Sequence, residues 1–147
     1  MILIDANLLV YAANRSAPEY GQARKWLDDR LSGSAAVGLP WMSLLGFIRL
    51  ASNPAVVRNP VAPEAAMGQV QEWLACPPVW IPQPGPEHAA ILGRLLAFPW
   101  MTSRLVPDAH LAALAIEHGL TLCSSDGDFA RFPGLRRENP LASHSDP

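Results

Sequence analysis

Short apolar runs alternate with longer segments of helical period along the chain. The apolar runs have the length of buried strands and are bounded by glycine, proline or polar residues. They cover residues 2–5, 35–39, 79–81 and 120–123, and a last edge strand is predicted over residues 135–138. Because strands that alternate with helices are typical of a parallel sheet covered on both faces, the pattern predicts an α/β fold. The expected architecture is a three-layer α/β/α sandwich with a central parallel sheet of four or five strands.

Helical segments fill the intervals between these runs. Residues 19–31 place Ala23, Trp26, Leu27 and Leu31 on one face, as expected of a helix packed on a sheet. Prolines set several boundaries, since the residue before a proline disfavours helix. The predicted helices are one that starts at residue 6 and breaks near residues 16–18, followed by 19–31, 41–51, 63–75, 87–98 and 108–118, with a loop over 100–104.

The composition fits one small domain. The chain has 147 residues, half of them apolar, so a single domain over residues 1–147 is predicted, with 139–147 as a flexible polar tail. The net charge of −2 indicates no basic surface for nucleic acid. Residues 35–51 are almost wholly apolar, but Pro40 and Arg49 interrupt them and the stretch is short for a bilayer. A buried strand, a turn and an amphipathic helix explain this stretch better than a membrane span.

Cysteine usage indicates a reducing compartment. Cys76 and Cys123 lie in apolar contexts and lack the spacing of a metal cluster. Two buried thiols are the preferred interpretation, and a disulfide is the alternative. No charged segment followed by a long apolar stretch begins the sequence, so no secretory signal is predicted and a cytoplasmic location is expected.

Aspartates stand where predicted strands end and helices begin. Asp5 closes the first strand, Asp108 opens the helix over 108–118, and Asp126 and Asp128 follow the strand over 120–123. In a parallel sheet these positions converge on one crevice. Each aspartate alone has an ordinary role as a helix cap or as a charge facing the helix dipole. Together, crowded carboxylates repel one another and are usually neutralised by a hard divalent cation such as Mg²⁺ or Mn²⁺.

At these acidic positions the chain resembles the PIN-domain ribonucleases, specifically the VapC toxins of bacterial VapBC toxin–antitoxin systems. The resemblance covers nearly the whole length and is most specific from residue 108 to residue 139. It is carried by Asp5-Ala6-Asn7, by Pro107-Asp108-Ala109-His110-Leu111-Ala112-Ala113 and by Ser124-Ser125-Asp126-Gly127-Asp128-Phe129.

The resemblance implies a PIN-like sandwich, RNA cleavage that depends on Mg²⁺ or Mn²⁺, and a cognate VapB antitoxin. It also implies a homodimer and a toxin–antitoxin hetero-oligomer. Carried over by position, Asp5, Asp108 and Asp126 match the catalytic metal-binding acids, Asp128 an auxiliary metal-binding acid, and Asn7 and Ser124 supporting polar residues. A metal ion in such a site activates water and stabilises the charge that grows on the scissile phosphate.

One departure from the family pattern lies in the helix over 41–51. The family usually has a glutamate early in this helix, and Gly46 stands at that position. The site could have fewer acids, Glu87 could substitute, or catalysis could be weakened. Arg49 lies three residues beyond Gly46 on the same helical face, where it would either contact an RNA phosphate or face solvent.

The remaining polar and aromatic residues have mainly structural interpretations. His110 and His118 are expected at the core edge or surface rather than on zinc, and a serine hydrolase is not predicted. Trp41 and Trp100 are candidates for a groove that binds a partner helix. Arg15, Arg58 and Arg104 fall in loops, where solvent exposure is expected and an RNA phosphate contact is the alternative.

Two further functions remain as alternatives. One is a catalytically impaired PIN-like module that binds antitoxin or RNA without cleavage, because of Gly46. The other is an aspartate-dependent phosphatase or phosphoacceptor, which needs a lysine beside the acids. Lys25 is the only lysine, and it lies in a predicted amphipathic helix away from them.

Overall fold

A five-stranded parallel sheet forms the centre of the protein. The computed structural model describes residues 1–142, and the strand order is β3-β2-β1-β4-β5. The strands are β1 (Ile2–Ile4), β2 (Val37–Gly38), β3 (Val79–Trp80), β4 (Thr121–Cys123) and β5 (Arg137–Glu138). β1 is central because Ile2 pairs with Val37 on one side and with Thr121 on the other. The predicted parallel α/β sheet is therefore confirmed, with strands shorter than predicted.

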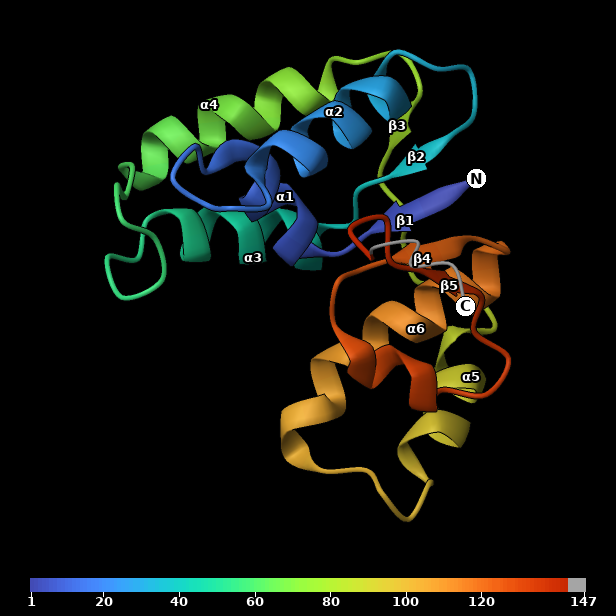
Figure 1. Cartoon of the computed structure of the whole chain (residues 1–147). Helices are drawn as coiled ribbons and strands as arrows, with labels where there is room; N and C mark the ends of the chain where they lie inside the picture. Colours follow the sequence, from blue (N-terminus) through green and yellow to red (C-terminus); the bar gives the residue numbers. More distant parts are fainter. Residues whose placement is uncertain (143–147) are drawn as a thin grey trace, which may run out of the picture.

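Helices cover both faces of this sheet. Figure 1 shows α1 to α4 on one side and α5 and α6 on the other. Their bounds are α1 (Ala6–Ala13), α2 (Tyr20–Leu31), α3 (Trp41–Ala51), α4 (Pro63–Leu74), α5 (His88–Leu96) and α6 (Val106–His118), with short 3₁₀ helices η1 (Ser103–Leu105) and η2 (Gly127–Arg131). The three-layer sandwich is thus also confirmed. None of the helices in residues 1–142 is long and apolar enough to cross a membrane.

The alternation of side chains along β1 and β4 creates two hydrophobic cores. Ile2 and Ile4 pack in the core under α1 to α4, whereas Leu3 packs in the core under α5 and α6. On β4, Cys123 packs in the core under α1 to α4, and Leu122 packs in the core under α5 and α6. β1 is buried on both faces, which explains why its sequence is continuously apolar, and β4 is buried in the same way at Leu122 and Cys123. This rigid centre positions every residue that follows β1 or β4.

Two predicted boundaries near the site differ from the structure. The helix predicted to begin at Asp108 begins at Val106, and Pro107 occupies its first turn, where a missing N–H costs no hydrogen bond. The segment predicted as a loop over 100–104 ends in η1, whose Leu105 is buried. α6 ends at Gly119, which adopts a left-handed φ of 67° that favours glycine.

One of the two cysteines differs from expectation. Cys123 is buried and free, and burial raises the pKa of its thiol to about 12. Cys76 is free but only half-buried, because it lies just beyond the end of α4, so the prediction of two buried thiols is wrong for Cys76. Within the predicted tail, Leu141 packs against the core under α1 to α4. Residues 143–147 of that tail lie outside the described residues.

Candidate active site

Capping bonds hold Asp5 and Asp126 where β1 and β4 end, and the start of α6 brings Asp108 beside Asp126. Asp5 directly follows the central strand β1 and caps α1, accepting the Ala6 N–H at 2.8 Å. Asp108 lies in the first turn of α6, where a carboxylate meets the positive end of the helix dipole. Asp126 follows β4 and caps η2, accepting the Asp128 N–H at 2.9 Å. The capping roles and the clustering are therefore compatible.

Three of the four aspartates form one group. Asp108, Asp126 and Asp128 each place a carboxylate oxygen within 4.8 Å of the others. Asp108 and Asp128 are half-buried, and Asp126 is exposed. Asp5 is not a member of this group among the described residues, although the resemblance implied that it would be a primary ligand. Asp128, which the resemblance implied to be only an auxiliary acid, is by contrast a full member of the group.

A hydrogen-bond network attaches Asp5 to this group. The Ser124 hydroxyl donates to Asp5 Oδ2 at 2.8 Å and accepts the Asp126 N–H at 3.0 Å. Ser124 Oγ also accepts the Asn7 side-chain amide at 3.2 Å. A hydroxyl has one proton and two lone pairs, so the buried Ser124 is fully bonded. The structure thus brings Asn7 and Ser124 together with Asp5 and Asp126.

The site concentrates negative charge that the protein itself does not balance. Burial raises the pKa of Asp108 to about 6, with further contributions from the charges of Asp126, Asp5 and Asp128. Burial also raises the pKa of Asp5, although hydrogen bonds from Ser124 and Ala6 partly offset this effect. Arg104 is the one cation that acts on Asp108, and its effect is the smallest of the causes.

The donor set of this group fits a hard divalent cation. All available ligand atoms are carboxylate oxygens, which Mg²⁺ and Mn²⁺ prefer. A dication would also relieve the repulsion that raises the pKa of Asp108. Asp108, Asp126 and Asp128 are the residues that could hold such an ion directly, and Asp5 stands beside them.

Comparison with known proteins assigns the chain to a family. Residues 2–135 match the family model of the PIN domain. Ribonuclease VapC37 of Mycobacterium tuberculosis is 44% identical over 142 residues, which cover 97% of this chain and 99% of that protein. The chain belongs to the PIN-domain family and is of the VapC type. Ribonuclease VapC33 of the same species is 38% identical, with coverage of 96% and 99%.

Solved structures share the fold of this VapC-type chain. The sarcin–ricin-loop-cleaving toxin VapC20 of Mycobacterium tuberculosis superposes with a TM-score of 0.66 at 19% identity, covering 92% of this chain and 99% of that one. VapBC2 from Rickettsia felis, crystallised on a promoter DNA fragment, gives a TM-score of 0.64 at 20% identity, with coverage of 95% and 98%. At these identities the likeness concerns the fold.

Gly46 lies against the residue that follows Asp5. A Cβ atom at position 46 would stand 2.9 Å from the Ala6 Cβ, closer than such atoms approach in proteins. Because Ala6 begins α1, the absence of a side chain on Gly46 permits α3 to pack closely on α1 beside the site. A glutamate at position 46 would require the two helices to move apart.

Neither Glu87 nor Arg49 makes a hydrogen bond or ion pair with the four aspartates in the described part of the chain. Glu87 precedes α5, and its backbone N–H donates to the Glu117 carboxylate. It does not belong to the acidic group found within residues 1–142, so nothing supports Glu87 as a substitute acid. Arg49 is exposed in the last turn of α3. Its guanidinium makes no ion pair with any acid of the described chain, and its role as a phosphate contact stays a prediction.

A second polar cluster, which the sequence did not predict, lies where the start of α5 meets α6. His88 is buried, and its Nε2 lies 3.2 Å from His110 Nδ1. Glu117 accepts the backbone N–H groups of Gly85 at 2.8 Å and Glu87 at 2.9 Å, which lowers its pKa. The sequence pattern did not join these residues, because His88, Gly85 and Glu87 are brought to His110 and Glu117 only by the packing of α5 on α6.

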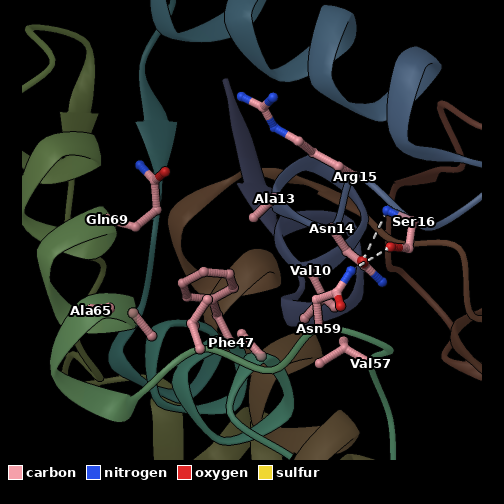
Figure 2. Close-up of a pocket in the computed structure, with 13 residues that line it drawn as sticks. Val10, Ala13, Asn14, Arg15, Ser16, Phe47, Val57, Asn59, Ala65 and Gln69 are labelled. Atoms are coloured by element: carbon pink, nitrogen blue, oxygen red, sulfur yellow. Dashed lines mark hydrogen bonds between the residues drawn. The ribbon is translucent and has the colours of Figure 1, made fainter. Parts of the chain in front are cut away.

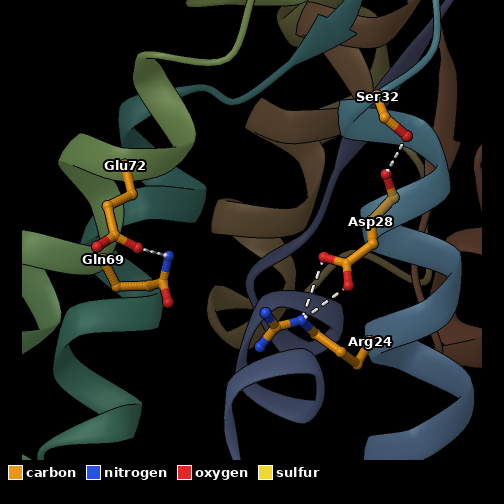
Figure 3. A network of polar contacts seen from close by, with 5 residues as sticks. All are labelled: Arg24, Asp28, Ser32, Gln69 and Glu72. Carbon is orange, nitrogen blue, oxygen red and sulfur yellow. Dashed lines mark hydrogen bonds and ion pairs between the residues drawn. The ribbon is translucent and has the colours of Figure 1, made fainter.

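Two surface hollows lie away from the acids. One, of about 370 Å³, is formed by α1, α3 and α4 and has Phe47 and Val57 in its apolar wall and Asn14, Arg15 and Asn59 around it (Figure 2). The other lies between α2 and α4, where Arg24 pairs with Asp28 (Figure 3). None of the four aspartates lines either hollow.

Proposed function

We propose that this protein is a divalent-metal-dependent endoribonuclease toxin that uses Mg²⁺ or Mn²⁺ and is neutralised by a VapB-type antitoxin. The observation that carries the proposal is the group of three carboxylate oxygens from Asp108, Asp126 and Asp128, within 4.8 Å of one another. The raised pKa of Asp108 supports it, because uncompensated charge favours a bound cation. Relatives that cover nearly the whole chain are named ribonucleases, which supports RNA as the substrate.

The side chains divide into ligands and supports. Asp108, Asp126 and Asp128 hold the cation, and Asp5 completes the catalytic set as a second-layer or direct ligand. Ser124 and Asn7 fix the orientation of Asp5 through the hydrogen bonds to Ser124 Oγ. A bound ion supplies a water of lowered pKa and stabilises charge on the scissile phosphate. Because the ion itself would lower the pKa of its bound water, the carboxylates need to serve only as ligands and no separate general base is required.

The partners form part of the same proposal. Structural neighbours include a VapBC complex of Salmonella typhimurium bound to DNA and a toxin–antitoxin complex of Klebsiella pneumoniae. We infer by analogy a VapB-type antitoxin, a homodimer and a toxin–antitoxin hetero-oligomer for this chain. A cytoplasmic location, where RNA and antitoxin are both present, is the corresponding expectation.

RNA cleavage by the purified protein tests the proposal. We expect single-stranded RNA to be cut with Mg²⁺ or Mn²⁺ and to stay intact in EDTA. Asp5→Ala and Asp108→Asn should abolish cutting without loss of the fold. Asp28→Asn is the matched control, because Asp28 is an exposed aspartate paired with Arg24 on α2. Cleavage that persists in EDTA, or in both site variants, would refute the metal mechanism.

A second candidate is a PIN-like module that binds antitoxin or RNA without cleavage. The glycine at position 46 favours it, because the helix that usually contributes an acid contributes none. Expression in a bacterial host separates the two functions. Growth arrest that Asp5→Ala relieves supports the nuclease, whereas no arrest together with antitoxin binding supports the module.

A further inference from the structure

Arg104 is the one cation paired with the acidic group in the described chain. Its Nη1 donates to Asp128 Oδ2 at 3.1 Å. The side chain is 70% exposed, whereas that of Asp128 is 24% exposed. The backbone of Arg104 is anchored, because the next residue, Leu105, is buried and leads directly into α6. The Arg104 guanidinium is therefore exposed beside the acidic group, on a backbone that is held in place.

This ion pair differs from the other arginine–aspartate pair on the surface. Arg24 and Asp28 lie one turn apart on α2, and each is balanced by the other (Figure 3). Asp128 is instead one of three grouped carboxylates, so Arg104 compensates only part of the local charge. An exposed ion pair contributes little stability, so its exchange for another partner costs little.

We propose that Arg104 is a substrate-contact residue that exchanges Asp128 for a phosphate of the RNA. This inference rests on the proposed nuclease function and adds a residue to it. A divalent cation and a guanidinium repel each other when they share the Asp128 carboxylate. With a cation held by the acidic group, the Arg104 guanidinium would contact a non-bridging oxygen of an RNA phosphodiester in place of Asp128.

The chemistry of the guanidinium suits this role. Its planar donors match phosphate oxygens, and a charge-assisted pair of this kind is stronger than a neutral hydrogen bond. The net charge of the chain is −2, and the site itself is acidic, so a single cation at the site has a large effect on an approaching polyanion. Neither Arg15, which borders the hollow of Figure 2, nor Arg49 makes such an ion pair.

Metal binding without RNA gives the first measurement. We expect Arg104→Ala to bind Mn²⁺ several-fold more tightly than wild type by calorimetry, because the competing cation on Asp128 has been removed. Arg104→Lys should lie between the two. Arg24→Ala is the control, since it removes another exposed arginine that is ion-paired to an aspartate, away from the acidic group, and it should leave Mn²⁺ affinity unchanged. Weaker Mn²⁺ binding by Arg104→Ala would show that Arg104 only holds Asp128 in place and would overturn the proposal.

RNA binding gives the second measurement, in the cleavage-deficient Asp5→Asn background with saturating Mn²⁺. The slope of log affinity against log salt should fall by about 0.7 when Arg104 becomes alanine, the value for one phosphate contact on a single strand. The same substitution should leave the slope unchanged in EDTA, where Asp128 retains the guanidinium. An unchanged slope in Mn²⁺ would overturn the inference.

Cleavage kinetics in the otherwise wild-type protein complete the test. We expect kcat/KM to fall about tenfold or more for Arg104→Ala and less for Arg104→Lys, which keeps the charge but not the planar fork. If Arg104→Ala cuts RNA at the wild-type rate, the proposed role of Arg104 is overturned, whereas the proposed nuclease function stands. A wild-type protein that neither cuts nor binds RNA with Mn²⁺ would overturn the proposed function as well.

Discussion

Two polar clusters on the same helix show opposite electrostatic designs. At the start of α6, Asp108 groups with Asp126 and Asp128, and among the described residues only Arg104 forms an ion pair with this group. Toward its end, Glu117 accepts two backbone N–H groups, and Oε1 lies 4.0 Å from His88 Nδ1. Both clusters contain carboxylates with little exposure to solvent. The first cluster accumulates negative charge. In the second cluster, backbone N–H groups hydrogen-bond the negatively charged Glu117.

The pKa directions express this difference. Burial and neighbouring aspartates raise the pKa of Asp108, whereas hydrogen bonds from Gly85 and Glu87 lower the pKa of Glu117. A carboxylate that is fully bonded within the fold belongs to the structure, because it holds the start of α5 against α6. A carboxylate held among other carboxylates is costly unless a ligand arrives. The contrast therefore separates Glu117, a structural acid, from Asp108, which we propose holds a cation.

Neutralising one acid in each cluster should have the largest effect. We expect Asp108→Asn to weaken Mn²⁺ binding by at least about a hundredfold, more than loss of an outer-shell partner does. RNA cleavage should fall with it. Glu117→Gln should keep Mn²⁺ affinity and cleavage, because Glu117 is not in the acidic group. Calorimetry and gel-based cleavage measure both, and equal loss in the two variants would erase the functional distinction.

The next largest effect is expected in how thermal stability depends on pH, which Asp108 should change. Its folded pKa of about 6 exceeds the ordinary value of 3.8, so ionisation destabilises the metal-free fold as pH rises through that interval. In EDTA, Asp108→Asn should therefore melt several degrees above wild type at pH 7. The difference should shrink as pH falls toward 4. A variant that melts below wild type at pH 7 would show that the Asp108 charge is already compensated.

Glu117 should show the opposite dependence. Its folded pKa lies below the ordinary value of 4.5, so the charged form stabilises the fold above that pH, and the contribution is lost as pH falls below it. Glu117→Gln should melt below wild type at pH 7, and the gap should narrow at acid pH. Thermal melts across pH measure this, and a constant gap would mean that only shape, not charge, matters here.

Filling position 46 tests whether α3 can add an acid to the first cluster. Gly46→Ala gains helix propensity but forces α1 and α3 apart, so a net loss of about 1 kcal/mol is expected. Gly46→Glu should lose at least as much and gain no Mn²⁺ affinity. Adding Ala6→Gly removes the facing Cβ and should restore stability in the double variant. If Gly46→Glu alone tightens Mn²⁺ binding, the helices separate more easily than this packing indicates.

The smallest effect is expected where a carboxylate has its own exposed cation. Asp28→Asn breaks the pair with Arg24 on α2, and the stability change should stay within about 0.5 kcal/mol. Urea denaturation measures it. A change as large as that from Glu117→Gln would show that exposure does not separate these classes of acid.

The sequence by itself located the acids and the sheet. Asp5, Asp108 and Asp126 were placed correctly at strand ends and helix starts, because capping and apolar runs are local properties of consecutive residues. The parallel α/β architecture followed from the same alternation. Boundaries such as the start of α6 at Val106 were missed by two residues, since η1 and α6 are continuous.

Only the tertiary structure decided how the acids divide. Asp5 is bonded by Ser124, 119 residues away in the chain, and lies beside the group of carboxylates that Asp128 joins. The Arg104–Asp128 pair and the Gly46–Ala6 approach likewise depend on how η1 meets η2 and how α3 crosses α1. Sequence patterns report which elements form and which residues end them. Distances between side chains on different elements are set by packing, which no local pattern encodes.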